Sequence, residues 1–135
     1  MEAEELHKNK SVNQVLARAK NDAEIVAVVL FGSRARHEAS SASDVDLCLI
    51  LRPGKYDALT LSRKRLNYLK ESDADIYIFS QLPLYIRKRV IKEGKILLCR
   101  DEDALYEIAF RTVQAFEDFK HIYYGYLEGL VNAGP

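Results

Sequence analysis

The central part of the sequence, residues 25–51, reads IVAVVLFGSRARHEASSASDVDLCLIL. Its first segment, Ile25–Phe31, is a continuous apolar and β-branched run, which is typical of a strand covered on both faces. Gly32 ends this run, and a short helix is expected to begin at Ser33. A second strand is predicted over residues 44–51, before a Pro-Gly turn signal. The stretch therefore predicts two buried strands that are joined by a polar segment.

The remaining elements follow from apolar periodicity and turn signals. Helices are predicted over residues 11–20, 56–70, 83–92 and 101 to about 129, and short strands over 75–79 and 95–99. In the helix over 56–70, the side chains expected to face inward are Leu59, Leu66 and Leu69. We therefore expect an α/β (α+β) fold, a small mixed β-sheet flanked by helices. It forms a single domain over 1–135, with a core over about 25–100 and a helical C-terminal extension over 101–135.

Composition limits the class of protein. The 135 residues are 48% hydrophobic and 30% charged, which suits one globular domain. No apolar run approaches the roughly 20 residues of a membrane span, and the charged first residues do not resemble a signal peptide. Two cysteines in separate apolar runs are typical of buried cytosolic thiols and provide no zinc-ligand spacing. A cytoplasmic protein with no membrane partner is the expectation.

Charge is unevenly distributed although the formal net charge is zero. Residues 32–100 carry a net charge of +6, and residues 101–135 carry −5. A basic central segment suits a phosphate-bearing ligand, and an acidic tail suits a basic partner, although solvated helix faces would give the same pattern. The overall balance argues against direct nucleic-acid binding, which normally requires a net basic surface.

Two carboxylates stand at the start of the second predicted strand. Asp44 and Asp46 are two residues apart, so both project to one face of the strand. Like charges side by side are costly unless a cation neutralises them, and carboxylate oxygens suit Mg²⁺. Taken alone, this pair is more often an exposed strand start than a metal site.

The Gly-Ser pair after the first strand favours the metal-site interpretation. Gly32 allows close approach of backbone to a ligand, and a helix starting at Ser33 would offer N–H groups to an anion. Arg34 and Arg36 would stand in the first turn of that helix, where they could reach phosphate oxygens. Gly-Ser, ten residues and then Asp-x-Asp, with each piece at a strand end, is a rarer combination than either piece alone.

A third carboxylate is available at the head of the next predicted strand. If the strand that Asp75 begins lies beside the strand of Asp44 and Asp46, three acids meet at one end of the sheet. Three carboxylates can hold two divalent ions, which stabilise the attacking and leaving oxygens of a phosphoryl displacement. Asp73 has the same strand parity, but Asp75 directly adjoins the apolar run and is preferred.

Together, Gly32-Ser33-x-Ala35-Arg36, Ser43-Asp44-x-Asp46-Leu47 and Asp75 resemble the DNA-polymerase-β-type nucleotidyltransferases, and more narrowly the minimal nucleotidyltransferases. The resemblance covers about residues 25–99 and implies transfer of a nucleoside monophosphate to an acceptor hydroxyl, with two Mg²⁺ ions. It implies that Gly32 and Ser33 hold the outer phosphates, with Arg36 and less clearly Arg34 as further contacts. It also implies that Asp44 and Asp46 bind both metals and that Asp75 binds the catalytic metal and helps activate the acceptor.

The second half of the chain resembles the MntA-type antitoxins. The resemblance rests on the segments Gln81–Leu84, Lys92–Lys95 and Leu98–Asp101 and on the aromatic tail after Phe116. It implies ATP as the substrate and, as partner and acceptor, a HEPN-type RNase toxin that is inactivated by AMP addition to a tyrosine. A homo-oligomer or a hetero-oligomer remains open. The alternatives are a small-molecule nucleotidyltransferase, for example one that modifies an aminoglycoside, and a non-catalytic module that neutralises a partner by contact.

The aromatic tail allows two interpretations. Phe116, Phe119, Tyr123, Tyr126 or Leu127, and Leu130 recur at helical spacing. Packing against the domain's own sheet is the more frequent outcome for such a stripe, and docking of a partner is the alternative. Because Tyr123, Tyr124 and Tyr126 cannot all face one way, some of them are expected to be exposed or to meet a partner.

Overall fold

The computed structural model of the protein describes residues 3–32 and 45–132. The elements of these residues are, in chain order, α1 (Ala3–Lys20), β1 (Ile25–Phe31), β2 (Asp46–Leu51), α2 (Ala58–Leu69), β3 (Asp75–Ile78), the 3-10 turn η1 (Phe79–Gln81), α3 (Leu84–Glu93), β4 (Lys95–Cys99) and α4 (Glu102–Asn132). Within this part of the chain every predicted helix and strand is present. The ends differ by a few residues, except that α1 begins at Ala3, eight residues before the predicted start of its helix at residue 11. The helix expected to begin at Ser33 lies outside the described residues.

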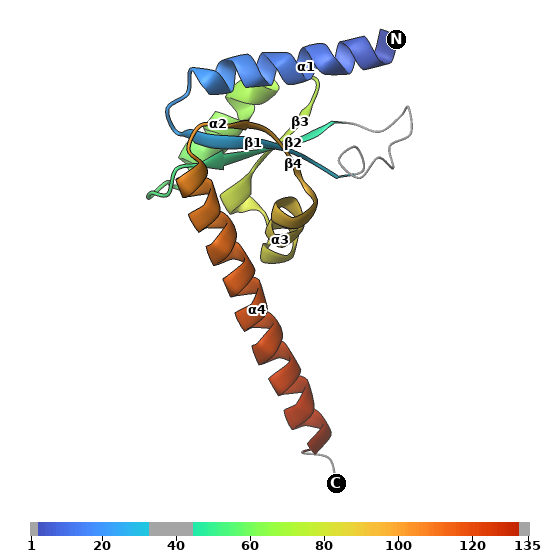
Figure 1. Ribbon diagram of the computed structural model, residues 1–135, viewed down its shortest axis with the longest axis vertical. Helices are drawn as coiled ribbons and strands as arrows, with labels where there is room; N and C mark the ends of the chain where they lie inside the picture. The colour runs from blue at the N-terminus through green and yellow to red at the C-terminus, as the bar shows by residue number, and fades with distance from the viewer. Residues whose placement is uncertain (1–2, 33–44, 133–135) are drawn as a thin grey trace.

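The four strands form one mixed sheet in the order β3-β2-β1-β4. β1 is antiparallel to both of its neighbours, whereas β2 and β3 are parallel. This arrangement confirms the predicted small mixed sheet, with helices on both of its faces (Figure 1). Because β2 and β3 run in the same direction, both strands begin at the same end of the sheet, where β1 finishes.

Alternation of side chains along β2 divides the core into two layers. Val45, Leu47 and Leu49 are buried against α1 and α2, in a cluster that includes Val15 and Tyr68. The intervening β2 side chains, Cys48 and Ile50, pack on the other face. There they contact a cluster that includes Val90 of α3 and Leu105 at the start of α4. Asp46 has the parity of Cys48 and Ile50, so its carboxylate lies on the α3/α4 face of the sheet.

The inward face of α2 differs from the prediction. Leu59 and Leu66 are 61% and 53% exposed, so the expectation that they point into the core is wrong. Leu61 and Tyr68, which repeat with the same spacing of seven residues, are buried instead, and Leu69 is half-buried. Tyr68 tolerates burial because its hydroxyl donates to Asp22 Oδ2 at 2.9 Å, a partner supplied by the α1–β1 connection.

α4 is supported along only part of its length. Its first turns pack on the sheet and α3, whereas its second half extends beyond the sheet (Figure 1). Packing on the chain's own sheet therefore holds for only the first part of the aromatic tail: Phe116 is half-buried, whereas Phe119 and Tyr123 are 57% and 50% exposed. Docking of a partner on the exposed part stays a prediction. Across residues 3–32 and 45–132, no helix combines the length and apolar character needed to cross a membrane.

Candidate functional site

Two carboxylates are adjacent where β2 and β3 begin. Asp46 on β2 is the register partner of Asp75 on β3. Register partners on parallel strands present their side chains to the same face, here the one that carries α3 and α4. Both residues are partly exposed. The structure therefore brings together two of the three carboxylates that the sequence analysis selected.

Three hydrogen bonds hold the start of β3 in place. The Asp75 N–H donates to the carbonyl of Val45 at 2.8 Å, which locks the first residue of β3 against β2. Before it, the Ala74 N–H donates to Ser72 Oγ at 3.1 Å, and the Ser72 hydroxyl donates to the Ser11 carbonyl of α1 at 3.2 Å. These bonds hold Asp75 beside Asp46 without using either carboxylate.

Gly32 closes the same end of the sheet from the β1 side. It has a φ of +84°, a left-handed conformation that glycine adopts without strain. A Cβ placed on Gly32 would lie 2.5 Å from Asp46 Oδ2, which is too close for any side chain to be accommodated. Glycine is therefore required here by backbone conformation and by the proximity of the carboxylate.

The sequence analysis did not identify an aromatic pair beside the carboxylates. Phe31, the cross-strand partner of Asp46, contacts Tyr77 edge to face, with ring centroids 5.4 Å apart. Arg65 of α2 reaches around the edge strand β3: its Nε donates to the Ile76 carbonyl at 2.5 Å, and its guanidinium lies 5.7 Å from the Tyr77 ring centroid. Phe31 directly precedes Gly32, and Tyr77 has the parity of Asp75, so both positions were readable from the motif. Nothing in the sequence around Arg65 indicates its contacts with Ile76 and Tyr77.

Asp73, the rival of Asp75, occupies a different environment. It is exposed in the bend before β3 and lines a hollow with Lys10, Gln14 and Lys70, between α1 and the end of α2. It has no register partner on β2 in the ladder that joins Asp46 to Asp75.

Four predicted site residues fall outside the described part of the chain: Ser33, Arg34, Arg36 and Asp44. Among residues 3–32 and 45–132, no three His, Cys, Asp or Glu side chains are grouped so as to hold a metal ion. The adjacent carboxylates of Asp46 and Asp75 are the oxygen donors that the described residues would offer to a metal at this end of the sheet, and this donor type fits Mg²⁺.

Apart from Cys48, the groups of the described residues whose protonation is shifted lie away from the carboxylate pair. At the opposite end of β1, Lys64 Nζ contacts Asp22 Oδ2 at 2.7 Å and Glu24 Oε1 at 3.0 Å. Burial disfavours the charged form of Asp22, but hydrogen bonds from Lys64, Tyr68 and the Glu24 N–H hold the pKa of Asp22 below its ordinary value. Burial raises the pKa of the Cys48 thiol well above its usual range, which keeps this thiol protonated beneath the site. These shifts belong to packing rather than to the carboxylate pair.

Comparisons with known proteins agree with this arrangement. The family profile described as "Polymerase beta, Nucleotidyltransferase" matches residues 13–103. The MJ1547 protein of Methanocaldococcus jannaschii, by its name a candidate protein adenylyltransferase, is 30% identical over 96 residues. That match covers 71% of this chain and 73% of the relative.

Solved structures share the fold. A toxin–antitoxin crystal structure with AMP-PNP has a TM-score of 0.63 at 18% identity, and the match covers 92% of this chain and 98% of that one. A complex of tri-AMPylated Shewanella oneidensis HEPN toxin with MNT antitoxin has a TM-score of 0.60 at 17% identity, with 95% and 98% coverage. At these identities the likeness is one of architecture, and it extends over α4 as well as the sheet.

Proposed function

This chain belongs to the polymerase-β-type nucleotidyltransferase family, and from that premise we propose that it transfers AMP from ATP to a hydroxyl of a partner protein. The observation that carries the proposal is the register pairing of Asp46 with Asp75. Beside this pair lies Gly32, a position where the backbone conformation and the nearby carboxylate leave no room for a side chain. Paired carboxylates at a strand end, next to a glycine that allows close approach of the backbone to a ligand, suit phosphoryl transfer better than hydrolytic acid–base chemistry.

Each residue of the site has a separate task in this proposal. Gly32, with Ser33, Arg34 and Arg36, holds the outer phosphates of ATP. Asp46 and Asp75, with Asp44, would hold Mg²⁺, which when bound neutralises charge on the phosphates. The two carboxylates already share one face, so little rearrangement of the strands is needed for them to act together.

The reaction is an in-line displacement. The acceptor hydroxyl oxygen forms a bond to the α-phosphorus of ATP, the bond from that phosphorus to the bridging oxygen breaks, and pyrophosphate leaves. Asp75 accepts the hydroxyl proton. The chain contributes mainly positioning and electrostatic stabilisation, as in phosphoryl transfer generally.

The acceptor is proposed to be a HEPN-type toxin that this protein silences as its antitoxin. Support comes from the candidate protein adenylyltransferase MJ1547 and from the AMPylated HEPN toxin complex that shares the fold. The described residues form one four-stranded sheet with its helices, and no second sheet or helical bundle that could hold an acceptor stands among them. A second chain that brings its own tyrosine would supply the missing half of the site.

A transfer assay tests the proposal. The protein is incubated with labelled ATP and Mg²⁺, with and without the product of the neighbouring gene, and intact masses are measured. We expect the wild type to add one or more AMP units to that partner, and we expect the Asp46→Asn variant to add none. If AMP were transferred only to members of a small-molecule panel, the acceptor would be a small molecule and not a protein. If the Asp46→Asn variant neutralised the partner as effectively as the wild type does, the protein would act by binding its partner and not by catalysis.

A further inference from the structure

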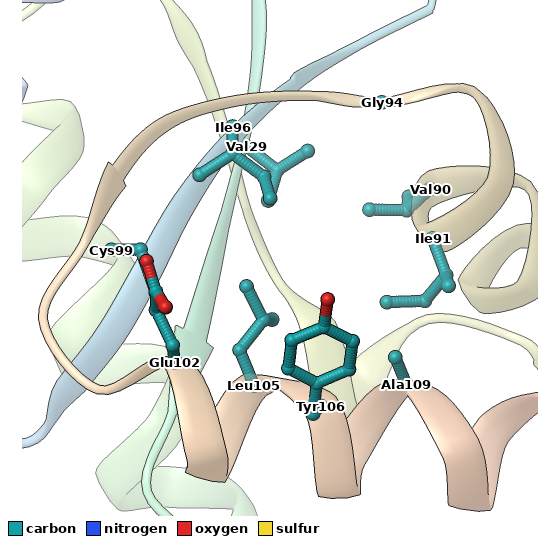
Figure 2. A pocket seen from close by; sticks show the side chains of 10 residues that line it. All are labelled: Val29, Val90, Ile91, Gly94, Ile96, Cys99, Glu102, Leu105, Tyr106 and Ala109. Atoms are coloured by element: carbon teal, nitrogen blue, oxygen red, sulfur yellow. The ribbon is translucent and has the colours of Figure 1, made fainter.

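Two hollows of different chemistry lie against the first half of α4. Figure 2 shows the first, an apolar cavity of about 390 Å³ between β4, the end of α3 and the first turns of α4. Of the described residues that line this cavity, only Glu102 is charged. The second hollow, of about 600 Å³, is lined by Arg52, Arg87 and Arg111, and we call it the arginine hollow.

The arginine hollow lies where β2 and β3 finish. It is lined by the last residues of β2, by Phe79 and Ser80 directly after β3, and by α4. Asp46 and Asp75 are the first residues of the same two strands, so the carboxylate pair stands at the opposite end of the sheet. At about 3.3 Å per residue, the six residues of β2 separate the two ends by roughly 16 Å. The hollow is therefore a separate place in the fold, at the carboxyl ends of parallel strands, where ligands commonly bind.

Three elements each bring one arginine to the hollow. Arg52 follows β2, Arg87 belongs to α3 and Arg111 belongs to α4. Glu107 is the one carboxylate among the described residues that line the hollow, and its Oε1 pairs with Arg111 Nη2 at 2.6 Å. Three arginines against one carboxylate give the described lining a net charge of +2. A half-enclosed positive charge of this kind is stabilised by an anion.

The guanidinium groups are oriented by contacts that use only some of their donors. Arg52 Nε donates to the Ala23 carbonyl at 3.1 Å, and Arg52 Nη1 pairs with Asp101 at 3.0 Å. Arg87 Nε donates to the Leu82 carbonyl at 3.0 Å, and within the described part of the chain its two amino groups pair with no carboxylate. Because a guanidinium has five N–H groups, each of the three arginines keeps donors for a ligand.

The floor of the hollow is apolar. Ile50 and Phe79 are buried, and Tyr56 is half-buried with its hydroxyl donating to the Arg52 carbonyl at 3.1 Å. Guanidinium forks bind phosphate oxygens in a bidentate manner, and an apolar floor with aromatic rings suits a planar ring system. A volume of about 600 Å³ lies within the range of about 300–1,000 Å³ that holds small-molecule ligands.

We infer that the arginine hollow binds a nucleotide, at a site distinct from the carboxylate pair. The phosphates of this nucleotide accept hydrogen bonds from the three guanidinium groups, and its base lies on the apolar floor. An inorganic anion would leave the floor uncovered, and an apolar ligand would leave the arginines without a partner. Binding involves no covalent step and no metal, so the inference does not depend on the proposed transfer reaction.

Calorimetric titration of the wild type in buffer with EDTA tests the inference, with AMP, ATP and pyrophosphate as the probes. Without divalent ions the two carboxylates of the opposite end repel phosphates, so binding there is disfavoured. We expect both nucleotides to bind one to one. Pyrophosphate, which cannot cover the apolar floor, should bind about tenfold more weakly.

Single arginine variants identify the residues that hold the phosphates. Arg87→Met should weaken nucleotide binding about tenfold, the scale of one lost hydrogen bond to a charged group. Arg89→Met is the matched control on the same helix, because Arg89 pairs with Glu93 at 3.5 Å and lines neither hollow. It should bind as the wild type does. Arg111→Gln should also weaken binding, and its folding is not at risk because the Arg111 side chain is 71% exposed.

Amide chemical shifts locate the ligand within the fold. In two-dimensional nitrogen–proton spectra, AMP should shift the amides of residues 52–56, of Ser80 and of residues 107–112. The amides of Gly32 and Asp46 should stay in place.

Four results would overturn the inference. They are no binding of either nucleotide at millimolar concentration, pyrophosphate binding as tight as that of ATP, equal losses in Arg87→Met and Arg89→Met, and chemical-shift changes confined to the end of the sheet that carries Asp46.

Discussion

Asp46 and Asp75 occupy one register position of the parallel β2–β3 ladder, so the protein holds two like charges side by side at one end of its sheet. Directly opposed like charges on neighbouring strands destabilise a sheet by about 0.2–1 kcal/mol. We therefore expect Asp75→Asn, in buffer without divalent ions, to unfold at the same or a slightly higher temperature than the wild type. Transfer of AMP should fall by orders of magnitude, because the carboxylate proposed to act at the acceptor hydroxyl is gone.

Calorimetry with and without Mg²⁺ separates these two effects. Magnesium should raise the melting temperature of the wild type, since a ligand that binds only the folded state stabilises it, and should not raise that of Asp46→Asn/Asp75→Asn. Asp73→Asn is the control, because that carboxylate is exposed in the bend before β3 and lines a separate hollow with Lys10 and Lys70. If Asp73→Asn abolished the magnesium effect and Asp75→Asn did not, the two residues would have to exchange roles.

Gly32→Ala should damage both folding and transfer. Alanine at a φ of +84° costs about 1–2 kcal/mol, and its Cβ would lie 2.5 Å from Asp46 Oδ2, which forces that carboxylate to move. We expect a loss of stability of that size in urea denaturation together with a large loss of transfer. Gly54→Ala provides the comparison, since its Cβ would make ordinary contact with the Tyr56 ring at 3.4 Å. Equal behaviour of the two variants would contradict a special role for Gly32.

The strands and the mixed sheet were predictable because each strand is a short apolar run closed by a turn signal. Asp75 was predictable for the same reason, since it directly precedes the buried Ile76. The face of α2 was not predictable. Leu59/Leu66 and Leu61/Tyr68 give the same helical period, and the choice between them depends on Asp22, which accepts the Tyr68 hydroxyl from another element.

The length over which α4 is supported was also beyond local reasoning. Leu105 and Tyr123 belong to one continuous apolar stripe with an unchanged period, yet Leu105 packs against the core and Tyr123 is 50% exposed. Periodicity reports which side of a helix is apolar but not where the surface beneath it ends. Arg65, which reaches around the edge strand to the Ile76 carbonyl, is a second contact of this kind.

Lys64→Met should lower the stability of the fold over the pH range in which both Asp22 and Lys64 are charged. The pKa of Asp22 is lowered in the folded state, so its contribution is present above the ordinary carboxyl range and lost as the pH falls through that lowered pKa. Burial opposes charge on Lys64, but its hydrogen bonds with Asp22 and Glu24 raise its pKa. Its contribution is therefore present below pH of about 10 and lost at higher pH.

Urea denaturation at a series of pH values checks this. Near neutral pH the Lys64→Met variant should be less stable by about 2 kcal/mol, the scale of a hydrogen bond to a charged group. The difference from the wild type should shrink below pH of about 4 and above pH of about 10, where the wild type loses the pair. Lys55→Met, at an exposed loop position, should show no such dependence. A difference that stays constant with pH would mean that Lys64 acts through packing of its aliphatic stem alone.

Arg100→Met should loosen the attachment of α1 to the sheet. The Arg100 guanidinium, at the end of β4, donates to the carbonyls of Ala19, Lys20 and Asp22, where α1 ends. Cations that satisfy the last carbonyls of a helix also oppose its negative dipole end, so we expect a loss of about 1–2 kcal/mol. Hydrogen exchange should accelerate in the last turn of α1 and at the start of β1, while β2 and β3 keep their protection. Arg63→Met, on the exposed face of α2, should leave every rate unchanged. Uniform acceleration across the whole sheet would instead assign Arg100 to global stability.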